Sequence, residues 1–103
     1  MERQPWDGRP ALMMADQKGI KMELKETIEM MNSADYKDRF KAEYFQLKIR
    51  YEQLQNMIEE WDNGKLDFTP SAGHAVYMSQ LFAMETYIDV LEFRAEKENI
   101  KLN

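Results

Sequence analysis

Residues 40–61 read FKAEYFQLKIRYEQLQNMIEEW, and large apolar side chains recur in them at alternating spacings of four and three residues. The recurring residues are Phe40, Tyr44, Leu47, Tyr51, Leu54, Ile58 and Trp61. A repeat that averages about 3.5 residues keeps one apolar seam on a single side of an α-helix. This run therefore predicts a helix, at about residues 36–62, that packs along its length against a second apolar seam.

A matching seam lies further along the chain. Its members are Tyr77, Leu81, Met84, Ile88, Leu91 and Ala95. Two helices that each carry one narrow apolar seam bury both seams by packing against each other. The two runs therefore predict an antiparallel helical hairpin with a coiled-coil-like seam.

The residues between the two seams support a single turn. Residues 62–70 read DNGKLDFTP, in which Asn63-Gly64 is typical of a left-handed helix stop. Thr69-Pro70 is typical of a helix start, and Ser71-Ala72 is an alternative one. We expect the second long helix to begin at one of these two pairs and to end near Glu98.

The N-terminal third of the chain has a weaker pattern. Residues 1–16 are interrupted by proline and glycine and predict a flexible tail. Residues 17–34 predict a short amphipathic helix, because four apolar residues fall on one of its faces. These four are Ile20, Leu24, Ile28 and Met31. Residues 35–103 are the hairpin domain, so the predicted fold is all-α: a short helix followed by a long antiparallel hairpin.

Composition excludes several classes of protein. The 103 residues carry a net charge of −5 and no cysteine, which excludes disulfides and thiolate metal sites. The net charge is spread evenly along the chain and no face forms a basic stripe, so we expect no direct binding to duplex nucleic acid. No run approaches the roughly 20 apolar residues that span a bilayer, and the first residues lack the apolar core of a signal peptide. The chain is expected to be soluble and intracellular.

No set of residues predicts catalysis. His74 is the only histidine, and it falls where we expect an exposed first turn of a helix. The chain has no glycine-rich phosphate loop, no nucleophile with a base at a readable spacing, and no metal-ligand spacing. We therefore expect no enzyme activity, no catalytic residue, no cofactor and no metal ion.

A second apolar stripe marks the last predicted helix. It runs through Phe82, Ala83, Tyr87 and Val90, and a two-helix seam cannot cover it. Either the short N-terminal helix covers it in a compact three-helix monomer, or a second subunit does. The shortness of the N-terminal helix favours a homo-oligomer.

Two groups of residues are candidates for binding. Arginine forks recognise phosphate and stack on aromatic rings, so a ligand pocket is predicted at subunit junctions. Its candidate residues are Tyr87, Arg94, Arg50 and Arg39. The alternative is that each arginine forms a solvated salt bridge. A second group of acidic residues is a candidate surface for a basic protein partner. These are Glu43, Glu59, Glu60 and Asp62.

Several segments also resemble a family of proteins. The segments are DYKDRFKAEY at 35–44, RYEQL at 50–54, GKLDFTP at 64–70, and scattered matches from Gln80 to Glu96. Over residues 35–102 the chain resembles small helical proteins of tailed phages and prophages, related to a product of crAss-like phages. Residues 1–34 look like an extension of that family. The resemblance implies a phage accessory protein in the host bacterial cytoplasm, of a kind that often counters host immunity.

Three functions follow from the residues and the resemblance together. The first is a non-enzymatic anti-immune protein whose oligomer sequesters a nucleotide signal, with Tyr87 and Arg94 at the junctions. The second is a direct inhibitor of a host defence enzyme, such as a CRISPR nuclease, that presents the acidic surface and blocks nucleic-acid entry. The third is a plain interaction module that binds another phage protein.

Overall fold

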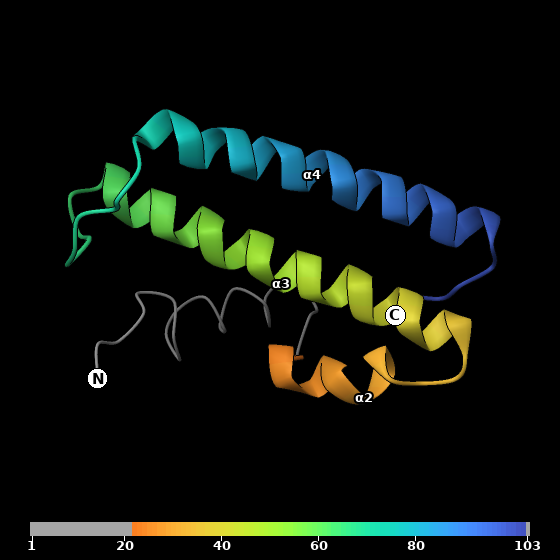
Figure 1. The fold of residues 1–103 in the computed structure, drawn as a ribbon. Coiled ribbons are helices and arrows are strands. Elements are labelled where there is room, and N and C mark those ends of the chain that lie inside the picture. The colour runs from red at the N-terminus through yellow and green to blue at the C-terminus, as the bar shows by residue number, and fades with distance from the viewer. Residues whose placement is uncertain (1–21, 103) are drawn as a thin grey trace.

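The computed structural model describes residues 22–102 and shows an all-α fold, with no strand in that range. The elements are a 3-10 helix η1 (Leu24–Thr27), a single turn α2 (Ile28–Met31), and two long helices, α3 (Tyr36–Asp62) and α4 (His74–Lys97). Figure 1 shows α3 in the middle, with α4 along one side and α2 along the other. The expected all-α fold with a long antiparallel hairpin is therefore confirmed.

Local signals fix both ends of α3 at the predicted residues. Asp35 caps the first turn, where its side chain accepts a hydrogen bond from the Lys37 amide at 3.0 Å. At the other end Gly64 adopts a φ of 70°, and the Lys65 amide returns to the Glu60 carbonyl at 2.8 Å. This is the closed loop of a Schellman motif, which requires a left-handed residue after the helix.

The start of α4 differs from the expectation. The helix begins at His74, with Gly73 as its extended N-cap, and not at Thr69-Pro70 or Ser71-Ala72. The Ala72 amide donates to the Tyr77 hydroxyl at 3.3 Å, so a side chain from the first helical turn holds the preceding residues outside the helix. A proline start signal depends only on neighbouring residues, so it does not predict the hydrogen bond that Tyr77 makes with Ala72.

The two predicted seams form the core. One buried cluster lies toward the open end of the hairpin and contains Phe40, Tyr44, Ile88, Leu91, Ala95 and Ile100. A second lies toward the turn and contains Leu54, Met57, Ile58 and Leu81. Leu47, Tyr51, Trp61, Tyr77 and Met84 are half-buried against these clusters, so every seam residue is at least partly covered.

The N-terminal segment packs on α3 alone. Within residues 22–102, η1 and α2 contact α3 but not α4. Thr27 is fully buried, and Met22 and Leu24 cover Ile49 on the side of α3 that faces away from α4. Within residues 22–34, the segment expected as a single amphipathic helix is a 3-10 turn followed by one α-turn.

The apolar face predicted for that helix is only partly used. Leu24 is half-buried, whereas Ile28 and Met31 are 53% and 47% exposed. The change from 3-10 to α geometry rotates the later residues away from α3, because the two helix types differ in residues per turn. Ile20 and the predicted tail at 1–16 lie outside the described residues.

No helix within residues 22–102 has a stretch that is long and apolar enough to cross a bilayer.

Candidate functional site

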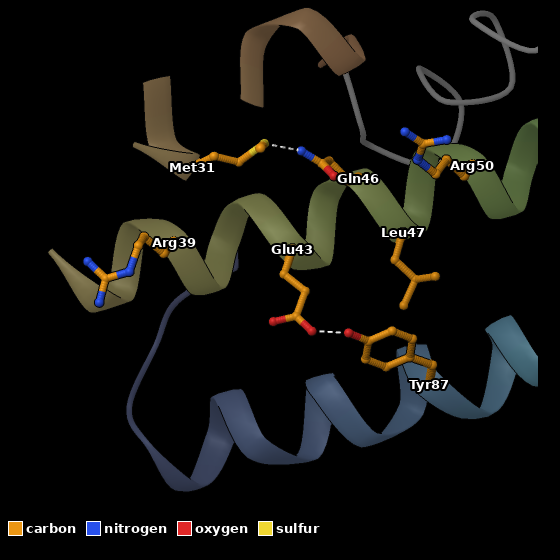
Figure 2. A pocket seen from close by; sticks show the side chains of 7 residues that line it. All are labelled: Met31, Arg39, Glu43, Gln46, Leu47, Arg50 and Tyr87. Atoms are coloured by element: carbon orange, nitrogen blue, oxygen red, sulfur yellow. Dashed lines mark hydrogen bonds between the residues drawn. The ribbon is translucent and has the colours of Figure 1, made fainter. Parts of the chain in front are cut away.

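A pocket of about 390 Å³ lies along α3 and is also lined by one residue of α2 and one of α4. It is lined by Met31, Arg39, Glu43, Gln46, Leu47, Arg50 and Tyr87. Figure 2 shows Arg39 and Arg50 at the two ends of this stretch of α3, while Tyr87 reaches across from α4. The volume falls within the range of about 300–1,000 Å³ that small-molecule sites occupy.

One stripe of α3 supplies most of the lining. Arg39, Glu43, Gln46, Leu47 and Arg50 follow at i, i+4, i+7, i+8 and i+11, which places them on a single helix face. The two arginines are about 16 Å apart along the axis, at about 1.5 Å per residue. Leu47 gives the middle of the stripe an apolar side chain between the two charged ends.

The aromatic side of the pocket is held by a hydrogen bond between helices. The Tyr87 hydroxyl donates to Glu43 Oε2, and this bond raises the pKa of the Tyr87 phenol above its ordinary value. The Tyr87 residue is 44% exposed. Tyr87 therefore presents one ring in a fixed position to anything that enters the pocket.

A polar contact ties α2 to the same site. The Gln46 amide nitrogen donates to the Thr27 hydroxyl at 2.9 Å and also contacts the sulfur of Met31 (Figure 2). Thr27 Oγ1 in turn donates to the Leu24 carbonyl at 2.7 Å. These bonds fix the N-terminal segment as one wall of the pocket.

The two guanidinium groups are bound differently. Arg39 donates from Nη1 to the Ser33 carbonyl at 2.8 Å and keeps further N–H donors. Among residues 22–102, the exposed Arg50 guanidinium has no hydrogen-bond or ion-pair partner. Together with Glu43 they leave the pocket with an excess of positive charge in a chain whose net charge is −5.

Arg50 also borders a second cavity of about 220 Å³. That cavity is lined by Leu24, Arg50, Gln53, Leu54, Gln80 and Met84. Since Arg50 lines both cavities, it stands between them on the surface of the hairpin. Among residues 22–102, it is the only lining residue that the two cavities share.

Arg94, expected beside Tyr87, lies outside this pocket. Its guanidinium donates from Nε to Glu98 at 3.3 Å and from Nη2 to the Tyr36 hydroxyl at 2.9 Å. It also stands 5.0 Å above the ring of Phe40. Arg94 thus fastens the open end of the hairpin, where α4 ends beside the start of α3.

The four acidic candidates do not form one surface. Glu43 lies in the pocket with Tyr87, about 24 Å along the helix axis from Glu59, at about 1.5 Å per residue. Glu59 and Asp62 are exposed near the turn, and Glu60 is half-buried there. Asp62 Oδ1 lies 2.9 Å from Nε2 of His74, which is exposed in the first turn of α4 as expected.

Sequence reasoning missed three of the lining residues as site residues. The sequence pattern gives Gln46 no role, marks Leu47 only as a seam residue, and marks Met31 only as part of the apolar face of the short helix. The stripe from Arg39 to Arg50 was the available signal, since two arginines eleven residues apart share a helix face. Within residues 22–102, no group of three or more histidine or acidic residues is arranged to hold a metal ion.

Comparison with known proteins identifies one family. The family model described as Sequestin matches residues 34–97, which is more than half of the chain. Curated proteins and solved structures provide no match. The matched segment contains α3, the turn and nearly all of α4, and with them six of the seven residues that line the pocket. On this match, the chain belongs to the Sequestin family.

Proposed function

We propose that this protein binds a small nucleotide in the pocket between α2, α3 and α4 and holds it away from its receptor. The observation that carries the proposal is a single pocket lined by two arginines, one toward each end, with a tyrosine ring and a leucine side chain between them (Figure 2). The family name, Sequestin, points to sequestration, and thus to binding rather than catalysis.

The chemistry of the lining fits a nucleotide. A guanidinium donates two parallel N–H bonds to a phosphate, and Arg50 has donors to spare. The Tyr87 ring and Leu47 offer flat and apolar surface on which a base can stack. The Gln46 amide nitrogen is already bound to Thr27 and Met31, which leaves the side-chain carbonyl oxygen to accept a hydrogen bond from a base edge. We assign Arg94 no contact with the nucleotide.

The biological setting that we propose is a phage or prophage protein in the bacterial cytoplasm. A stoichiometric binder lowers the free concentration of a signal without chemistry, provided that the binder is in excess and its Kd lies below the signalling concentration. An immune nucleotide signal suits such a device because its receptor responds to the free ligand.

Titration calorimetry on the full chain tests the proposal. The probes are cyclic dinucleotides and cyclic ADP-ribose isomers, each added to the wild type and to three variants. Arg50→Gln and Tyr87→Ala are expected to weaken binding of the active probe about tenfold or more, which is about 1.4 kcal/mol or more. Lys65→Gln removes the same charge from the exposed loop near the turn and should leave the affinity unchanged.

The outcome decides between two functions. Silence across the whole panel would sink nucleotide sequestration. The second candidate is then a direct inhibitor of a host defence enzyme, for instance of a CRISPR nuclease. The observation that favours it is the exposed acidic end of α3 with Glu59 and Asp62. That function predicts salt-sensitive binding to a protein, and an association rate that falls when Glu59 and Asp62 are both changed to lysine.

A further inference from the structure

The outer face of α4 carries an exposed apolar stripe that ends at Lys97, whose Nζ lies 5.2 Å from the centre of the Phe93 ring. Val76, Phe82, Val90 and Phe93 are 57%, 58%, 48% and 60% exposed. Within residues 22–102, η1 and α2 contact α3 and leave this face open. An exposed aromatic ring of this kind leaves on the order of 100 Å² in contact with water, since a whole aromatic side chain buries about 150–250 Å². With the two valines, the face reaches the size of a few hundred Å² that marks an interaction site on a monomer.

This face has the spacing of a second coiled-coil seam. Its central residues are Val76, Ser79, Ala83, Thr86, Val90 and Phe93. They alternate at three and four residues, opposite the Leu81, Ile88 and Ala95 positions that pack on α3. Ser79, Ala83 and Thr86 are small, which allows a second helix to approach closely. The other three side chains are bulkier and apolar. A helix that packs on one other helix needs a single apolar seam. α4 has one seam that packs on α3 and a second on its outer face.

We propose that two copies of this chain pair along this face, α4 against α4, with the two helices parallel. A second copy fits because the stripe is complementary to itself under two-fold symmetry, in which each residue of the seam meets its own copy. The 24-residue helix is about 36 Å long, enough for three heptads of contact. The pairing needs no nucleotide and stands independently of the function proposed above.

Charges beside the seam favour the parallel direction. Asp89 lies on one flank, and Arg94 lies on the other, five residues further along. In a parallel pair these two flanks meet, so that Asp89 of one copy faces Arg94 of the other. Arg94 retains N–H donors beyond the two that bind Glu98 and Tyr36. In an antiparallel pair, the flank that carries Asp89 and Glu96 would instead face the same flank of the other copy. Carboxylates would then lie opposite carboxylates.

The pairing has a consequence for the pocket. Phe82 and Tyr87 lie on opposite flanks of the seam and are five residues apart, as Asp89 and Arg94 are. Phe82 of one copy therefore lies beside Tyr87 of the other, and Tyr87 lines the pocket. Each pocket thus gains an aromatic neighbour from the second subunit at its α4 side.

The absence of cysteine makes the test direct. Ser79→Cys places a single thiol in the seam, and oxidation of a parallel pair joins Cys to Cys across the two-fold axis. Glu85→Cys, exposed on α4 but off the seam, is the matched control. We expect a covalent dimer from the first variant and none from the second, in protein without added nucleotide. Sedimentation of the wild type should give twice the monomer mass.

Charge in the seam gives the second arm. Val90→Lys and Phe93→Lys replace exposed side chains, so circular dichroism should retain the helical signal while sedimentation returns the monomer mass. A monomeric wild type, or lysine variants that remain dimeric, would overturn the pairing. A disulfide that forms only when Ser79→Cys is mixed with Val90→Cys would indicate antiparallel helices and overturn the direction.

Discussion

The hydroxyl of Tyr44 donates a hydrogen bond to Glu92 Oε2 at 2.7 Å and so joins α3 to α4. Tyr44 is 7% exposed, whereas Glu92 lies at the surface. Burial raises the pKa of the Tyr44 phenol strongly, and the hydrogen bond to Glu92 and the charge of that carboxylate raise it further. The folded hairpin therefore favours the neutral phenol over tyrosinate.

Tyr44→Phe should lower the free energy of unfolding at neutral pH by about 1 kcal/mol, the net worth of a hydrogen bond whose acceptor regains water. A raised folded-state pKa contributes stability that is complete below the ordinary tyrosine value and is lost as the pH rises through the folded-state value. The wild type should thus lose more stability than Tyr44→Phe above about pH 10. Urea unfolding at neutral and alkaline pH measures both effects, and equal losses in the two proteins would contradict this account.

Two glycines form a matched pair for the turn. Gly64 has a φ of 70°, so Gly64→Ala should destabilise the hairpin by about 1–2 kcal/mol, the cost of a left-handed alanine. Gly73 is an extended N-cap with open space around it, and Gly73→Ser should stabilise by about 0.5 kcal/mol through a capping hydroxyl and a less flexible unfolded chain. Thermal unfolding of the two variants should move in opposite directions. If both variants shifted the Tm in the same direction, the two glycines would not differ in backbone requirement in this way.

The contact of Tyr36, Arg94 and Glu98 predicts an acid dependence. The hydrogen bond from Tyr36, followed by the bond and charge of Arg94, lowers the pKa of the Glu98 carboxyl. A lowered folded-state pKa contributes stability above the unfolded value, and this is lost as the pH falls through the folded one. Glu98→Gln should lower the Tm at neutral pH, and the difference from wild type should disappear in acid. Glu96→Gln, which neutralises an exposed carboxylate in the last turn of α4, serves as the control and should change the Tm little at either pH.

The pocket predicts opposite effects from two neutralising substitutions. Glu43→Gln removes the carboxylate that faces the ligand space and should tighten binding of an anionic nucleotide a few-fold, while Arg50→Gln weakens it. Added salt should reduce both differences, because exposed charges are screened. Calorimetry at two salt concentrations measures these changes. If both variants weakened binding equally, charge would not be what holds the ligand.

The hairpin was predictable because its seam is a local, repeated signal. Phe40 through Trp61 bury one side of α3 as their spacing indicates. The same signal is silent about Ile49 and Thr27, which are buried where the N-terminal segment meets the opposite side of α3. α3 is covered on two sides, so its sequence has less contrast between an apolar face and a polar face. The spacing of its apolar residues therefore predicts only the seam that packs on α4.

The lining of the pocket was predictable in part. Arg39 and Arg50 share a helix face, and their meeting with Tyr87 follows from antiparallel pairing of the two helices. Arg94 lies two turns after Tyr87 on the same flank, which is why spacing grouped the two residues. Its contacts with Tyr36 and Glu98 depend on how the open end of the hairpin closes, and that is a tertiary arrangement that spacing does not encode.

The turn after α3 lies far from the pocket, and this separation is of practical use. Gly64 is fourteen residues beyond Arg50, about 20 Å along the axis at about 1.5 Å per residue. Lys65 and Asp67 are exposed there, between two helices whose ends are fixed independently by the Schellman closure and the Gly73 cap. A fluorophore or a fused reporter domain attached at Lys65 would sit clear of the ligand. The hairpin thus provides an attachment point from which it can be converted into a sensor for whatever it binds.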